Sequence, residues 1–123
     1  AFDELGAPVR SLTSPVGSMS GGQRQAIAIA RAVSWANRVV FLDEPTAALG
    51  VRQTKNVLET IRKVRDKGVA VVFISHVMPQ VMEVSDRIQV LRLGTRVATL
   101  QASQTSMEEL VSLMTGATGK GAA

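Results

Sequence analysis

The chain has 123 residues, of which 46% are hydrophobic and 20% charged. This composition is typical of one globular domain and too apolar for a disordered chain. It contains no cysteine and one histidine, which excludes disulfide scaffolds, cysteine nucleophiles and multi-histidine metal sites. The net charge is only +4, with no Tyr and one Trp, so the sequence does not favour a nucleic-acid partner. No apolar run approaches the ~20 residues of a direct membrane span.

The N-terminal third is expected to hold a loop followed by a helix. Residues 1–19 are expected to be a weak helix end and a loop, since they contain Pro8, Pro15 and Gly17. A helix is predicted from Gly21 to about Trp35 because the run is rich in alanine, with Ser20 as its N-cap. The chain starts without an initiator Met or an apolar signal segment, and we expect it to begin in the middle of a longer protein.

The middle of the chain predicts a strand, a helix and a second strand. Val39–Leu42 and Val69–Ser75 are continuous apolar runs, which predict strands buried on both faces. Residues 51–66 carry an apolar stripe that predicts a helix, and Gly68 is expected to close it. A strand–helix–strand unit of this length indicates a parallel sheet with a right-handed crossover.

Three smaller elements are expected further on. Pro79 can start a short helix through about Val84. Residues 87–92 and 96–100 flank Leu93-Gly94-Thr95 and predict a hairpin with a glycine turn. Residues 106–109 have the pattern of a capping box, which predicts a last helix that stops at Gly116.

The segment Ser20-Gly21-Gly22-Gln23 is the first candidate site. Backbone N–H groups at a helix N-terminus, together with the helix dipole, favour an anion such as phosphate, and glycines let it approach the backbone. The alternative is an ordinary N-cap with a flexible lead-in.

The second candidate site is Asp43-Glu44, which directly follows the first apolar run. Ligands of open α/β sheets bind at the carboxyl ends of the strands. One carboxylate there could serve a hydrated Mg²⁺, and its neighbour could orient or deprotonate a water. The alternative is a simple turn before Pro45. His76 ends the second predicted strand, at the same sheet edge, where it could contact a terminal phosphate or have a purely structural role.

In this order, the segments Ser20-Gly21-Gly22-Gln23, Asp43-Glu44-Pro45-Thr46 and Ile74-Ser75-His76 resemble the ATPase domain of ABC transporters. They look like that family's signature motif, Walker B strand and switch histidine. The local sequences of residues 44–51 and 86–92 are most similar to those of ATP-binding subunits of bacterial monosaccharide importers. The resemblance covers essentially the whole chain.

The resemblance implies a role for each matching residue. Ser20, Gly21, Gly22 and Gln23 would contact the γ-phosphate of an ATP held by the opposite protomer of a homodimer. Asp43 would support Mg²⁺ through a bound water, Glu44 would be the general base, and His76 would sense the γ-phosphate. Residues 47–50 would run along the dimer interface.

The sequence departs from the family pattern in four respects. Gly50 stands where the wider family usually has Asp, and Met19 replaces the usual Leu. The P-loop motif G-x-x-x-x-G-K-[ST] does not occur before Met19, and the glutamine loop is also absent. We therefore expect the C-terminal part of an ATPase domain, which by itself would be inactive.

The expected fold is a P-loop NTPase-like three-layer α/β domain, truncated at its N-terminal side. Residues 1–36 would end a helical subdomain, 37–115 would continue the catalytic core, and 116–123 would be a disordered tail. The implied function is ATP hydrolysis that drives sugar import, with a permease as partner, at the cytoplasmic face of the bacterial inner membrane. Two alternatives are a non-transport ABC ATPase and a non-catalytic fragment that keeps only the dimer interface.

Overall fold

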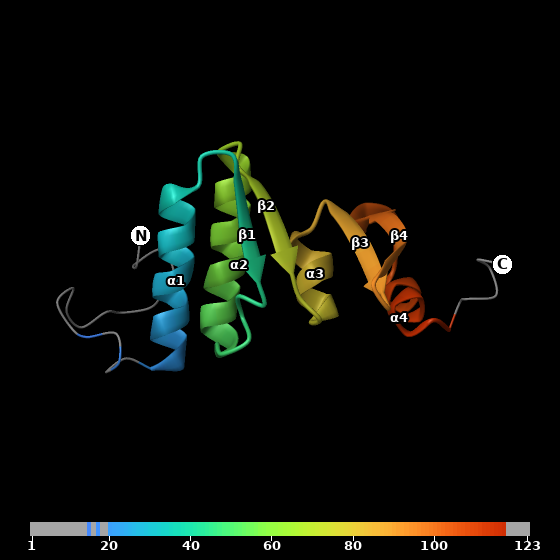
Figure 1. The fold of residues 1–123 in the computed structure, drawn as a ribbon, viewed down its shortest axis with the longest axis horizontal. Helices are drawn as coiled ribbons and strands as arrows, with labels where there is room; N and C mark the ends of the chain where they lie inside the picture. Colours follow the sequence, from blue (N-terminus) through green and yellow to red (C-terminus); the bar gives the residue numbers. More distant parts are fainter. Residues whose placement is uncertain (1–14, 16, 18–19, 118–123) are drawn as a thin grey trace. The chain divides into compact units, whose positions relative to one another are not determined.

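The computed structural model describes residues 15, 17 and 20–117 (Figure 1). Contacts divide the chain into two compact units, Ala1–Ser75 and His76–Ala123, which are treated separately below. Most of the loop expected over 1–19 and the end of the expected tail, 118–123, lie outside the described residues.

The first unit begins with helix α1, Gly21–Trp35, which confirms the predicted helix. Its start is a complete capping box. The Ser20 hydroxyl accepts a hydrogen bond from the Gln23 N–H at 3.2 Å, and the Gln23 side-chain oxygen accepts one from the Ser20 N–H at 3.0 Å. These two bonds satisfy backbone donors that a helix cannot pair internally. The prediction that Ser20 is the N-cap is thereby confirmed.

The rest of the unit is strand β1 (Val39–Asp43), helix α2 (Val51–Asp66) and strand β2 (Ala70–Ile74). The two strands pair in parallel, with Val39 opposite Ala70 and Asp43 opposite Ile74. The predicted parallel strand–helix–strand unit is thereby confirmed. Gly68 follows α2 with a φ of 92°, a left-handed conformation that suits glycine at the end of a helix.

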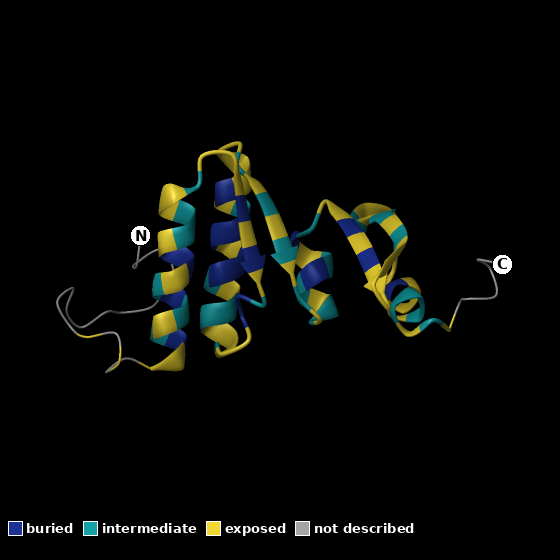
Figure 2. Ribbon diagram, viewed as in Figure 1, coloured by how far each residue is buried: buried dark blue, intermediate teal, exposed yellow. Residues whose placement is uncertain are grey.

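The prediction that both strands are buried on both faces is wrong for this chain. Val40 and Leu42 are buried, whereas Val39 is 44% and Phe41 67% exposed. Strand β2 alternates between exposed and half-buried residues, and Figure 2 shows the same banding along both strands. The reason is that α1 packs against β1 and α2 against β2, which leaves the opposite sheet face uncovered within the described part of the unit.

The second unit holds helix α3 (Met78–Val84), strands β3 (Arg87–Arg92) and β4 (Thr95–Gln101), a 3₁₀ turn η2 (Ala102–Gln104) and helix α4 (Met107–Thr115). The strands form the predicted antiparallel hairpin. Helix α4 packs against β3 and α3. The largest buried side chain is Leu110, which is 1% exposed, and Val84, Ile88 and Val90 are buried as well.

The hairpin turn is one residue shorter than predicted, because Thr95 already belongs to β4. Its two central residues, Leu93 and Gly94, have φ values of 50° and 77°, the arrangement of a type I′ turn, which matches the twist of the flanking strands.

Helix α4 starts and stops where the sequence predicted. The Ser106 hydroxyl accepts from the Glu109 N–H at 3.1 Å, as in a capping box, while the Glu109 carboxylate accepts from the Thr105 hydroxyl at 3.1 Å. Gly116 ends the helix in a left-handed conformation. None of the helices in the described part of the chain has the length and apolarity of a membrane span.

Candidate functional site

Three element ends meet at one end of the first unit: the N-terminus of α1, the carboxyl end of β1 and the N-terminus of α2 (Figure 1). Residues 45–50, which follow Glu44 in the connection from β1 to α2, lie at this end and are called the post-strand loop here. Helix N-termini and the carboxyl ends of parallel strands are the places where α/β folds bind anionic ligands.

The two glycines at the start of α1 lie in different environments. Gly21 is exposed, and a Cβ on it would come no nearer than 3.9 Å to the Ala48 Cβ. Gly22 is buried, and a Cβ there would lie 3.1 Å from the Gln53 Oε1 and 3.4 Å from the Leu49 Cδ2. Gly22 therefore lets the helix start pack closely on the post-strand loop, a packing role that sequence reasoning did not assign to it.

The two carboxylates at the end of β1 also differ. Asp43 is exposed and ends the strand opposite Ile74. Glu44 extends the ladder by one bond, since its N–H donates to the Ile74 carbonyl at 2.8 Å. Its backbone has a φ of 47°, and its Oε2 atom is buried from solvent. A non-glycine residue in this conformation costs of order 1–3 kcal/mol and persists only where its surroundings hold it.

The post-strand loop is a pair of tight turns. The Ala47 N–H donates to the Glu44 carbonyl at 3.2 Å, and the Leu49 N–H donates to the Thr46 carbonyl at 3.1 Å. Pro45 and Thr46 are both buried. From α1, the Gln25 side-chain amide donates to the Pro45 carbonyl at 2.9 Å. The loop that follows Glu44 is therefore fixed from inside and from the neighbouring helix.

His76 is an exposed residue between β2 and α3, and it is the first residue of the second unit. Asp43 and Glu44 belong to the first unit. The grouping of His76 with these two carboxylates stays a prediction.

Within residues 15, 17 and 20–117, no three His, Asp or Glu side chains gather into a group that could hold a metal ion. Mg²⁺ keeps several waters and is bound through one or two carboxylates together with substrate phosphates. The exposed Asp43 carboxylate can provide such a contact.

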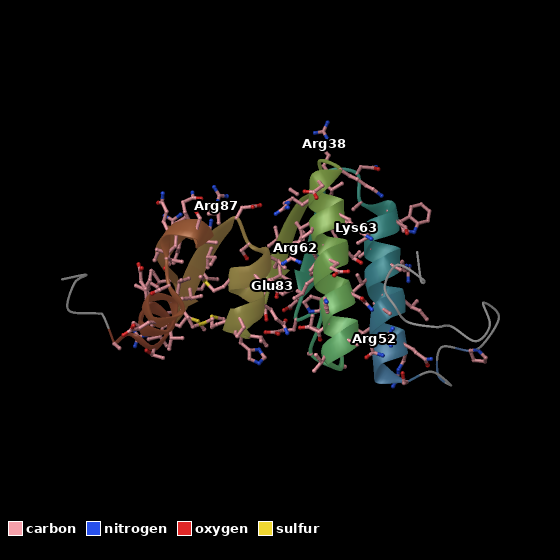
Figure 3. The ribbon with its side chains drawn as sticks, turned by 180° about the vertical axis from the view of Figure 1, so that it is seen from behind. Arg38, Arg52, Arg62, Lys63, Glu83 and Arg87 are labelled. Atoms are coloured by element: carbon pink, nitrogen blue, oxygen red, sulfur yellow. The ribbon has the colours of Figure 1, made fainter. Side chains whose placement is uncertain are left out.

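The basic residues in the described part of the first unit are spread along it and are not confined to this site. Figure 3 shows Arg52 at the end of α2 that carries the site and Arg38 at the opposite end of the unit, with Lys63 between them. On α2 the exposed cations are interrupted by Glu59 and Asp66. Such mixed charge is typical of a solvated helix face.

Sequence reasoning missed two residues of this region, Gln25 and Gln53. Gln25 lies on the same helical stripe as the buried Gly22, Ala26 and Ile29, and a polar residue on a buried stripe is the signal that could have found it. Gln53 accepts a hydrogen bond from the Gly50 N–H at 3.1 Å and so closes the start of α2. Its position three residues after the N-cap was the available signal.

Comparisons with known proteins show which family the chain is similar to. Residues 2–47 match a family model described as ABC transporter. The chain is 47% identical over 94% of its length to the fructose import ATP-binding protein FrcA of Rhizobium meliloti. It is 43% identical over 91% of its length to the ribose import ATP-binding protein RbsA 1 of Burkholderia ambifaria. The chain spans 45% of the first relative and 22% of the second.

The fold is similar to solved ATPase cassettes as well. A dimeric bacterial ABC transporter cassette covers 82% of the chain with a TM-score of 0.74 and 24% identity, and the chain spans 44% of it. The mixed helices and parallel strands thus match part of a P-loop NTPase-like α/β domain.

Proposed function

Since this chain carries part of an ABC transporter ATPase domain, we propose that the whole protein is the ATP-hydrolysing component of a sugar importer. The relatives are named for fructose and ribose import, which supports a monosaccharide as the transported substrate. The proposal extends to residues outside this chain, which would supply the P-loop that holds the nucleotide.

One observation carries the chemical part of the proposal. A pair of carboxylates, one exposed and one partly buried, follows a parallel strand directly and shares one end of the unit with a capped, glycine-containing helix start. This arrangement offers a base, a cation contact and an anion contact at the sheet end where α/β folds bind ligands.

In the proposed reaction, Glu44 is the general base. Its carboxylate would accept the proton of the water that attacks the γ-phosphate in line. Asp43 would hold Mg²⁺ through a bound water, and the ion would neutralise charge on the phosphates. Such reactions depend mainly on positioning and on stabilisation of charge, so a base on a rigidly held backbone suits the task.

The helix start at Ser20, Gly21, Gly22 and Gln23 would bind the γ-phosphate of an ATP held by a second copy of the protein. The capping box already uses the N–H groups of Ser20 and Gln23, so the anion would meet the N–H groups of Gly21 and Gly22 and the Ser20 hydroxyl. His76 would approach the same phosphate from the protomer that supplies Glu44. These roles require a homodimer with two composite sites.

The proposed partner in the membrane is a permease, which would place the ATPase at the cytoplasmic face of the bacterial inner membrane. A non-transport ABC ATPase is the alternative that uses the same residues. Sugar uptake separates the two, because only the importer links ATP hydrolysis to accumulation of a sugar.

The test uses the whole protein with its permease. We expect Mg²⁺-dependent ATP hydrolysis by the purified ATPase, and loss of labelled ribose or fructose uptake in cells that carry Glu44→Gln. Hydrolysis without any uptake defect for monosaccharides would contradict the importer and favour the non-transport alternative. Absence of hydrolysis in the unaltered protein would contradict the ATPase assignment itself.

For residues 1–123 alone we propose no ATPase activity and no tight ATP binding. P-loop backbone N–H groups and lysine supply most phosphate contacts in such enzymes, and the motif does not occur in this chain. Calorimetric titration of the purified chain with ATP and Mg²⁺ checks this. Binding in the micromolar range would contradict it.

A further inference from the structure

Gln25 makes a contact that the proposed roles do not use. It lies on the second turn of α1, and its side-chain Nε2 donates a partly buried hydrogen bond to the Pro45 carbonyl at 2.9 Å, across 20 residues of sequence. Pro45 has no N–H of its own, so its carbonyl, in the peptide between Pro45 and Thr46, is the backbone group of this residue that a neighbour can hold by a hydrogen bond.

That peptide follows a residue with an unusual backbone. Glu44 has a φ of 47°, a conformation that a side chain of this size adopts only under constraint from its surroundings. On the strand side, the Glu44 N–H is fixed by the Ile74 carbonyl at 2.8 Å. On the loop side, the Glu44 carbonyl accepts from the Ala47 N–H at 3.2 Å, and the carbonyl of the following residue, Pro45, accepts from Gln25. Glu44 is thus held by β2 on one side, and on the other side the residue after it is held by α1.

We propose that Gln25 is a positioning residue for the Glu44 carboxylate, an inference that rests on the proposed general-base role of Glu44. Without its hydrogen bond, the Pro45–Thr46 peptide loses its tie to α1, and its rotation can let Glu44 relax toward an ordinary backbone conformation. This rotation carries the carboxylate away from the attacking water. A displacement of about 1 Å of a catalytic group can cost ~10²-fold in rate.

The first test compares two substitutions of Gln25 in the whole protein. Gln25→Met keeps an unbranched side chain of similar length but removes the donor, whereas Gln25→Lys keeps a donor within reach of the Pro45 carbonyl. We expect Gln25→Met to lower kcat by about 10- to 100-fold with the KM for ATP nearly unchanged, and Gln25→Lys to recover most of the loss. Arg31→Met is the matched control, because it places methionine on an exposed position of the same helix.

The second test separates positioning from simple destabilisation. If Gln25 acts through Glu44, then Gln25→Met has no further effect on the residual hydrolysis of Glu44→Gln, because the base it positions is already gone. Independent losses that multiply would overturn the proposal, as would a normal kcat in Gln25→Met. If Gln25→Met does not fold, Gln25→Asn, whose amide is one methylene short, replaces it in both tests.

A third measurement does not depend on catalysis. The Ala47 N–H bonds to the Glu44 carbonyl and reports on the turn next to the base. Its hydrogen exchange is expected to be faster in Gln25→Met than in Arg31→Met. If the unaltered protein hydrolyses no ATP, the proposed function fails, and this exchange rate still decides the proposal: unchanged exchange overturns the role of Gln25.

Discussion

At the scale of single residues, Asp43 and Glu44 are neighbours in sequence but differ in environment. Asp43 is exposed, while Glu44 is half-buried, has a left-handed backbone and shields one carboxylate oxygen from water. Two adjacent carboxylates with unlike surroundings can perform unlike tasks, one in contact with a hydrated cation and the other with a reacting water.

Glu44→Gln in the whole protein is expected to keep ATP binding and lose hydrolysis. The amide preserves shape but cannot accept a proton, and a general base contributes about 10²–10⁴-fold. Asp43→Asn is the matched variant, and it should weaken Mg²⁺-dependent nucleotide binding as well. Single-turnover hydrolysis and equilibrium binding of labelled ATP distinguish the two. Near-normal turnover in Glu44→Gln would refute the general-base role and make His76 the next candidate.

At the scale of elements, the packing of α1 on the post-strand loop depends on Gly22. We expect Gly22→Ala to lower the free energy of unfolding by about 1 kcal/mol, because its Cβ would press on Leu49 and Gln53. Gly21→Ala is the control. It meets only the Ala48 Cβ at 3.9 Å, so it should be neutral or raise stability by up to about 1 kcal/mol through better helix propensity. Urea unfolding measures the change in the free energy of unfolding for each variant. Equal losses of stability in the two variants would contradict the role of Gly22.

In the hairpin of the second unit, by contrast, a substitution in the turn is expected to raise stability. Leu93 is 88% exposed and has a φ of 50°, so it contributes little packing while its backbone is strained by about 1 kcal/mol or more. Leu93→Asn should raise the Tm by a few degrees, since asparagine before glycine is favoured in type I′ turns. Leu91→Asn, at an exposed position within β3, should not. A Tm for Leu93→Asn at or below that of the unaltered chain would contradict this.

The elements were largely predictable from local patterns, whereas the covering of the sheet was not. The alanine-rich run after Ser20 and the apolar stripe over 51–66 gave α1 and α2 with the observed bounds. The continuous run Val39–Leu42 predicted two buried faces, but burial depends on what lies against each face, and only one is covered by described residues. The motifs identified Ser20, Asp43 and Glu44, whereas a contact 20 residues apart such as that of Gln25 requires the fold.

At the scale of the whole chain, the sheet face that the described residues of the first unit leave uncovered is an apolar surface. Its residues are Val39, Phe41, Ala70, Val72 and Ile74, all exposed on paired positions of the two strands. Contiguous apolar surface of this kind promotes association in water. It is also the surface through which further chain would be expected to pack.

Residues 1–123 alone should therefore self-associate as their concentration rises, and Phe41→Lys should reduce this, because Phe41 is 67% exposed on that face. Trp35→Lys is the control. It removes an apolar residue that is 81% exposed at the end of α1 and belongs to neither strand. Sedimentation velocity over a range of concentrations measures the effect. A chain that stays monomeric throughout, or an equal response to both substitutions, would contradict the role of the sheet face.

Asp43 lies at the end of the same uncovered face, opposite Ile74. Any segment or partner that covers Phe41 and Ile74 also removes water from this carboxylate, and an uncompensated charge then loses several kcal/mol of solvation. A divalent cation at Asp43 offsets that loss, and its attraction to the carboxylate grows as the surroundings become less polar. If Asp43 holds the proposed Mg²⁺, covering of the sheet and cation binding would be thermodynamically linked: each would strengthen the other by the same factor, so assembly of this face would depend on magnesium concentration.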